Sequence, residues 1–205
     1  MEDILYFLGV EDLDSLHESK KKLSKLNEDD HFIVHNVIDK WEDEQAIANI
    51  LLYPDIIDES YRWQTIEKGL ESYSNPYYIL AAIYGLQNLK SVPNSYQEKY
   101  FSRILRFCET KTDTLAVCAS VTATFLATEE NSYLLAEIYP VFNDNVNHNF
   151  VNHFVQKYDI AQIKAFAKKA GLPWGTKRLF IKECTKAKRN STPLVKAKIP
   201  NLKDA

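Results

Sequence analysis

The chain has 205 residues, a formal net charge of −3 and 45% hydrophobic residues, which suits one globular domain. It contains no apolar run long enough to span a membrane, and its acidic N-terminus lacks the basic region of a signal peptide. Three cysteines at unrelated spacings give neither a disulfide framework nor a zinc motif. We therefore expect a cytoplasmic protein without a cofactor and without contact with a membrane.

The N-terminal part of the chain is expected to be helical. Apolar residues recur at helical spacing within residues 13–26, 29–41 and 44–57. Strands are not expected anywhere, because the chain has only 5 glycines and no Asn-Gly or Asp-Gly hairpin signal.

Three later segments begin with the same Ser-Tyr pair, at Ser60, Ser95 and Ser132, which are 35 and 37 positions apart. Apolar or aromatic residues follow each pair at matching positions, and the serine hydroxyl is expected to cap the helix that it begins. A second helix is expected after each segment, within residues 75–89, 112–128 and 146–158. The first two are apolar on most faces and rich in small residues such as Ala82 and Ala119, which indicates buried inner helices. We expect the three outer helices to lie side by side in one layer and the three inner helices in another.

The chain is expected to end in two more helices and a tail. A helix within residues 160–171 stops at Gly171, and another covers residues 176–189. The sequence thus predicts about ten helices, in a single helical repeat domain over residues 1–190. Residues 191–205 are expected to form a basic, flexible C-terminal tail.

The paired helices, their period and Pro140 within an outer helix resemble HEAT-like or armadillo-like repeats. The resemblance covers about residues 10–190 and implies an all-α, right-handed α-solenoid of antiparallel helix pairs. The period is shorter than that of HEAT repeats, and the Asp and Arg common in their inner helices are missing. The resemblance therefore concerns the architecture and implies no catalytic residue. A compact, non-repeating helical domain is the alternative.

Charge is distributed unevenly along the chain. Residues 1–60 contain 16 acidic and 5 basic side chains, a balance of −11, whereas residues 160–205 contain 2 acidic and 12 basic, a balance of +10. A solenoid would turn this order into an acidic end and a basic end. The candidates for docking a basic protein are Asp12, Asp14, Asp29, Asp30, Glu42 and Asp43. The candidates for binding an anion or an acidic partner are Lys177, Arg178, Lys182, Lys186, Lys188 and Arg189.

Two smaller clusters of polar residues are candidate sites. His31, His35 and Asp39 follow i, i+4, i+8 spacing and share a helix face, so they are a metal candidate, although no metal is expected without a matching histidine-rich helix. A candidate groove for a peptide is formed by His148, Asn149, Asn152 and His153. Neither a glycine-rich phosphate loop nor a nucleophile motif is present.

These patterns favour a non-enzymatic protein-binding module, acting as an adaptor, an assembly subunit or an immunity-type inhibitor whose partner has a basic surface. The alternative is a nucleic-acid-binding protein similar to the HEAT-like DNA glycosylases, using its basic C-terminal face. Cations interleaved with Trp174 and Phe180 are typical of surfaces that bind phosphates and stack on bases.

Overall fold

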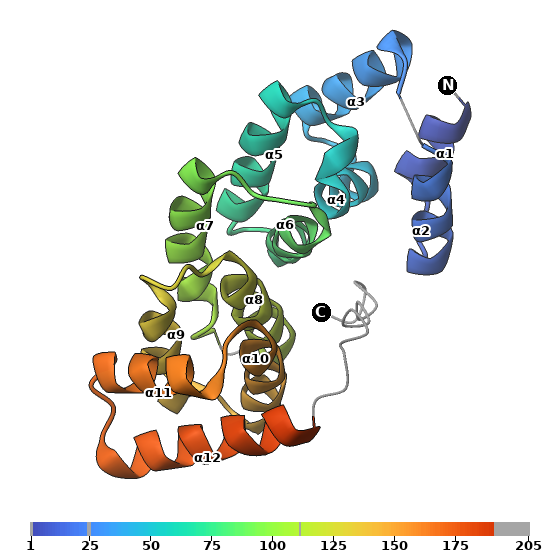
Figure 1. Cartoon of the computed structure of the whole chain (residues 1–205). Coiled ribbons are helices and arrows are strands. Elements are labelled where there is room, and N and C mark those ends of the chain that lie inside the picture. The colour runs from blue at the N-terminus through green and yellow to red at the C-terminus, as the bar shows by residue number, and fades with distance from the viewer. Residues whose placement is uncertain (1, 24–25, 111, 191–205) are drawn as a thin grey trace. The chain divides into compact units, whose positions relative to one another are not determined.

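The structure, a computed structural model, describes residues 2–23, 26–110 and 112–190 (Figure 1). These residues form twelve α-helices and two short 3-10 helices and contain no strand, which confirms the all-α prediction but exceeds the expected number of helices. No helix in the described ranges is long and apolar enough to cross a membrane. The predicted flexible tail, residues 191–205, lies outside the described residues.

The chain falls into two compact units, which comprise residues 2–91 and 92–190 of the described part. The prediction of a single repeat domain over residues 1–190 stays a prediction. The elements of unit 1 are α1 (Glu2–Gly9), α2 (Leu13–Lys22), α3 (Glu28–Lys40), α4 (Glu44–Leu52), η1 (Pro54–Ile56), α5 (Glu59–Glu71) and α6 (Pro76–Asn88). Those of unit 2 are α7 (Asn94–Phe107), α8 (Asp113–Leu126), α9 (Ser132–Ile138), η2 (Tyr139–Val141), α10 (Asp144–Lys157), α11 (Ile160–Lys169) and α12 (Trp174–Asn190).

The serines of the Ser-Tyr pairs do not cap the helices α5, α7 and α9. Asp58 caps α5, and its carboxylate accepts hydrogen bonds from the Ser60 hydroxyl and the Tyr61 amide. Ser132 lies within the first turn of α9, where its hydroxyl donates to the carbonyl of Thr128. The predicted serine caps are therefore wrong. Aspartate caps a helix as well as serine does, and Asp58 stands at the N-cap position of α5, whereas α7 and α9 begin without a side-chain cap.

Two prolines shorten helices that the sequence predicted to be longer. The helix expected within residues 44–57 ends at Leu52, and Pro54 begins the 3-10 helix η1. The outer helix expected to contain Pro140 ends at Ile138, and the proline lies in η2. In both places the ring removes an amide donor and blocks the preceding turn, so the α-helix cannot continue.

In unit 1, α4 is the central helix, and every residue from Ala46 to Leu52 is buried. It packs against α1, α3, α5 and α6. The contact with α6 is very close, because a Cβ atom built on Gly85 would lie 1.9 Å from the carbonyl oxygen of Leu51. Glycine is thus required for α6 to approach the backbone of α4. Ala82, one turn before Gly85, is fully buried, as the sequence predicted.

In unit 2, α8 packs against α7, α9 and α10, and α10 packs against α12. Small residues line α8, and Ala119 is fully buried as predicted. The contact between α10 and α12 is aromatic. Phe180 of α12 stacks on Phe150 at 6.3 Å between ring centroids and lies 5.9 Å from the ring of Phe154.

Adjacent inner helices run parallel within each unit, as matching hydrogen bonds at both of their ends show. At the N-terminal ends, Asn75 before α6 donates to Glu44 of α4 at 2.5 Å, and Asn143 before α10 donates to Asp113 of α8 at 2.6 Å. At the C-terminal ends, Asn88 of α6 donates to the Leu52 carbonyl at 2.7 Å.

The C-terminal end of α10 makes the corresponding contact through a lysine. Lys157 donates to the carbonyls of Thr124 and Phe125, at 2.8 and 2.9 Å, and to that of Ala127. Lys188 of α12 donates in the same way to carbonyls at the end of α10. These side chains bind carbonyls that have no partner within their own helix. The predicted arrangement of three outer and three inner helices in two layers extends over both units and stays a prediction.

Candidate functional site

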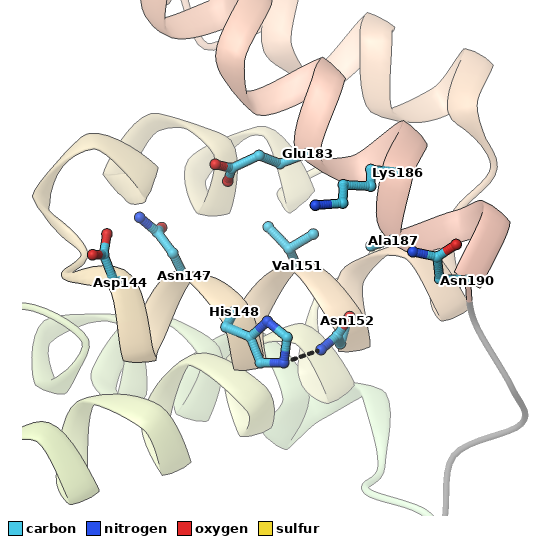
Figure 2. A pocket seen from close by; sticks show the side chains of 9 residues that line it. All are labelled: Asp144, Asn147, His148, Val151, Asn152, Glu183, Lys186, Ala187 and Asn190. Carbon is cyan, nitrogen blue, oxygen red and sulfur yellow. Dashed lines mark hydrogen bonds between the residues drawn. The ribbon is translucent and has the colours of Figure 1, made fainter.

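A groove of about 570 Å³ lies between α10 and α12 in unit 2 (Figure 2). Both helices present polar side chains to it, and most of these are charged or carry amides. The lining residues are Asp144, Asn147, His148, Val151, Asn152, Glu183, Lys186, Ala187 and Asn190.

Helical periodicity separates the groove-lining face of each helix from its core face. On α10 the lining residues recur at spacings of three and four, whereas Phe150 and Phe154 on another face are fully buried. On α12 the same spacing separates the lining residues from the buried Phe180 and Cys184. The aromatic contacts between the helices therefore hold two polar strips opposite each other.

One end of the groove is acidic. Asp144, Asn147 and Glu183 gather there, as Figure 2 shows. Glu183 is held in place by the buried Tyr139, whose hydroxyl donates to the glutamate Oε2 at 2.5 Å. Burial, together with this carboxylate, raises the pKa of Tyr139, so the phenol keeps its proton and remains a donor.

Asn147 adds an acceptor to the acidic end. Its Nδ2 donates to the Phe142 carbonyl at 3.3 Å. Its Oδ1 is shielded from solvent and has no hydrogen-bond partner among the residues that the structure describes. A buried acceptor without a donor is destabilising, so a bound donor that reached this amide would be stabilised.

The other end of the groove carries a cation and amides. Lys186 and Asn190 extend from α12, and Asn152 lines the groove from α10 beside His148, with Val151 between the two ends (Figure 2). Asn152 Nδ2 lies 3.1 Å from Nε2 of the exposed His148. Within the described part of the chain, Asp144, Glu183 and Lys186 form no ion pair with each other or with other residues. The groove thus presents separated charges of both signs that are not neutralised internally.

The predicted groove residues divide into two pairs. His148 and Asn152 line the groove. Asn149 and His153 bond instead within α10, where Asn149 donates to the Asn145 carbonyl at 2.9 Å and His153 Nδ1 lies 2.8 Å from the Asn149 carbonyl. Sequence reasoning missed the acidic residues of the groove. The one available signal was Glu183, an isolated acid within a strongly basic segment.

The predicted acidic docking residues have different local roles. Asp12 and Asp43 are N-caps, accepting from the amides of Ser15 and Ala46 at 2.8 and 3.0 Å. Asp30 is buried and completes a capping box with Asn27. Asp14, Asp29 and Glu42 are exposed and have no such capping role in the structure.

The predicted basic residues all lie on α12 and are also divided. Lys186 lines the groove, and Lys188 binds the end of α10. The guanidinium of Arg178 lies 5.4 Å from the ring centre of Trp174, which is 75% exposed. The remaining candidates are the half-buried Lys177 and the exposed Lys182 and Arg189.

The histidine pair of α3 has a different acidic neighbour from the one predicted. Ligand atoms of His31, His35 and Asp58 lie within 4.8 Å of one another. Asp39 is exposed and is not part of this cluster. The sequence predicted the two histidines correctly as neighbours on a helix face, but the carboxylate comes from the start of α5.

Thiol chemistry is disfavoured in the described structure. All three cysteines are buried, as expected for small core residues, and burial raises the pKa of the Cys184 thiol to about 12.

Comparison with protein-family models, curated proteins and solved structures gives no significant match to this chain. What the groove offers chemically is hydrogen bonding and charge recognition of an extended polar ligand.

Proposed function

We propose that the chain is a cytoplasmic protein-binding module, built as a HEAT-like solenoid of stacked helix pairs. The support for the architecture is the parallel stacking of α4 with α6, of α8 with α10 and of α10 with α12. Each stack repeats the same contact. A side chain near the C-terminal end of the later helix donates to carbonyls at the C-terminal end of the helix on which it stacks. Repetition of one interface between successive helix pairs is the basis of solenoid stability.

The groove between α10 and α12 is proposed to hold an extended peptide segment of a partner protein. The observation that carries this proposal is the set of Asp144, Glu183 and Lys186, three charges that face the groove without ion-pair partners in the described chain. A peptide with a basic side chain at one end and an acceptor or acidic group at the other would pair with them. Asn147 Oδ1 would accept a hydrogen bond from a peptide amide.

A second contact is proposed at the acidic side of unit 1. Asp14, Asp29 and Glu42 are exposed and would attract a basic surface on the partner by long-range electrostatics. The module would then act as an adaptor, an assembly subunit or an immunity-type inhibitor, three roles that use the same kind of surface.

Site-specific photocrosslinking tests the groove. A photoreactive benzoylphenylalanine at Ala187 is expected to link the groove to one discrete protein in extracts of the native host treated with nuclease. The same probe at Phe125, which is 43% exposed on α8 and does not line the groove, is the positional control. Lys186→Glu should reduce the crosslinked product about tenfold or more, because it places an anion where the partner presents its own acceptor.

Lys182→Glu is the matched control, since it makes the same change of charge one turn earlier on α12, outside the groove. It should leave the crosslinked product nearly unchanged. An equal loss in both variants would show that only the overall charge of α12 matters. No discrete product at residue 187, or a product insensitive to Lys186→Glu, would contradict binding in the groove.

Nucleic-acid binding is the second candidate function, favoured by the exposed Trp174 beside Arg178. An exposed indole flanked by cations can stack on an unpaired base. If this function is correct, a fluorescent single-stranded oligonucleotide should bind with strong salt dependence, and Trp174→Leu should weaken binding by about 1–3 kcal/mol. Equal binding by both proteins, or none by the wild type, would contradict it.

A further inference from the structure

A cluster of two histidines and one aspartate lies in unit 1, away from the groove. His31 and His35 are four residues apart on α3, and Asp58 is the N-cap of α5. One ligand atom from each residue lies within 4.8 Å of the others. All three side chains are partly buried, so a bound ion would be shielded from water on one side while remaining reachable.

One imidazole nitrogen of this cluster faces a carboxylate, and another faces no partner among the described residues. His31 Nδ1 and His35 Nε2 are both shielded from solvent. His35 Nε2 lies 2.8 Å from Asp58 Oδ2 and forms an ion pair with it when the imidazole is protonated. The shielded His31 Nδ1, which has no partner among the described residues, is destabilising as it stands, and a metal ion bound between the two histidines and Asp58 would satisfy it.

Neighbouring groups hold the ligands in position. The Asp58 Oδ1 atom is occupied by the Ser60 hydroxyl and the Tyr61 amide, which leaves Oδ2 facing His35. The Ser60 hydroxyl, with smaller effects that include the Tyr61 amide and His35, holds the pKa of Asp58 below its ordinary value, so Asp58 stays a carboxylate. The ring of His35 stacks on Tyr61 at 3.9 Å between centroids, which fixes its orientation. Such supporting contacts around a ligand are typical of metal sites.

We propose that His31, His35 and Asp58 bind one divalent transition-metal ion of the Zn²⁺ class. Imidazole nitrogens with one carboxylate oxygen are a ligand set that such ions prefer. In a tetrahedral site with bonds of about 2.1 Å, two ligand atoms are about 3.4 Å apart, so the ion would separate His35 Nε2 from Asp58 Oδ2 slightly, from 2.8 Å, and draw His31 toward them. Three protein ligands leave a fourth position for water. The ion would tie α3 to the start of α5.

Calorimetric titration of the untagged, full-length protein with Zn²⁺ tests the site. The wild type is expected to bind one ion per chain, and Co²⁺ in its place should give the visible absorption bands of low-symmetry N/O coordination. His31→Gln, His35→Gln and Asp58→Asn should each lower the affinity for Zn²⁺ about tenfold or more. Asp58→Asn is the most informative change, because asparagine preserves the cap of α5 and only the anionic ligand is lost.

Two control variants distinguish this ligand set from other ways of binding zinc. Asp39→Asn removes the carboxylate that lies on the same helix but outside the cluster, and His153→Gln removes a histidine of unit 2. Both should bind Zn²⁺ like the wild type. Added Zn²⁺ should also raise the melting temperature of the wild type but not that of Asp58→Asn. Absence of binding by the wild type, or binding that survives all three ligand changes, would overturn the proposal.

Discussion

Replacing Gly85 with alanine is expected to lower the free energy of unfolding of unit 1 by about 3 kcal/mol, at the upper end of the usual cost of overpacking. The added Cβ would lie 1.9 Å from the Leu51 carbonyl oxygen, and a backbone atom in the last turn of α4 cannot move aside alone. The two helices would have to separate, and their parallel contact would be lost. Urea unfolding in a Trp174→Phe background measures this, because the remaining tryptophans, Trp41 and Trp63, both lie in unit 1.

Two other glycines of unit 1 provide graded controls. At Gly69 a Cβ would meet the end of the Leu51 side chain at 2.8 Å, and a flexible side chain can rotate away, so Gly69→Ala should cost less than Gly85→Ala. At Gly9 nothing lies within 4 Å, so Gly9→Ala should be neutral or slightly stabilising. If Gly85→Ala behaved like Gly9→Ala, the close approach of α4 and α6 would be disproved.

Hydrophobic periodicity was sufficient to predict most of the helices, because apolar residues recur in them at helical spacing. The signals at helix ends were less decisive. Asp58 and Ser60 are both good capping residues, and only the structure shows that the aspartate caps α5 while the serine donates to it. Helix α1 was missed because its eight residues are too few for the period to stand out.

The sites depend on tertiary contacts, which a single sequence does not contain. Glu183 and Asp144 are 39 positions apart and meet only because Phe180 packs on the aromatic face of α10. The acidic neighbour of the two histidines of α3 also depends on a tertiary contact. Helical spacing pointed to Asp39, but the closer carboxylate comes from the neighbouring helix. Periodicity identifies which residues share a helix face, and it does not identify what lies opposite that face.

The contacts at helix ends explain why successive inner helices run parallel. A helix leaves up to four carbonyls unbonded at its C-terminus, and in both units the next inner helix supplies the missing donors. Asparagine does this at the end of α6 and lysine at the end of α10. Because the donors differ chemically, no repeated sequence motif marks them, although the structural contact repeats.

The same kind of contact holds α1 in place, through the fully buried Asn49 of α4. Its Nδ2 lies 2.9 Å from the Phe7 carbonyl, 3.1 Å from that of Leu8 and 2.9 Å from that of Val10. Asn49→Leu keeps the size of the side chain but leaves the Phe7 and Leu8 carbonyls without this donor, whereas the Val10 carbonyl still accepts from Gln45 Nε2 at 3.0 Å. Each unsatisfied buried group costs about 1–3 kcal/mol, so we expect a loss of about 2–4 kcal/mol in the free energy of unfolding of unit 1.

The effect of Asn49→Leu should be largest at α1, because the lost hydrogen bonds all hold its C-terminal end. Hydrogen exchange of the α1 amides should therefore become faster, and α2, which packs against α1 and carries the exposed Asp14, should lose protection with it. Asn88→Leu is the matched control, since it removes a single bond from a half-buried asparagine at the end of α6 and should cost about 1 kcal/mol. If both changes cost the same and α1 exchanged as slowly as in the wild type, the apolar contacts of Ile4, Phe7 and Leu8 would be sufficient to hold α1, and Asn49 would not be its anchor.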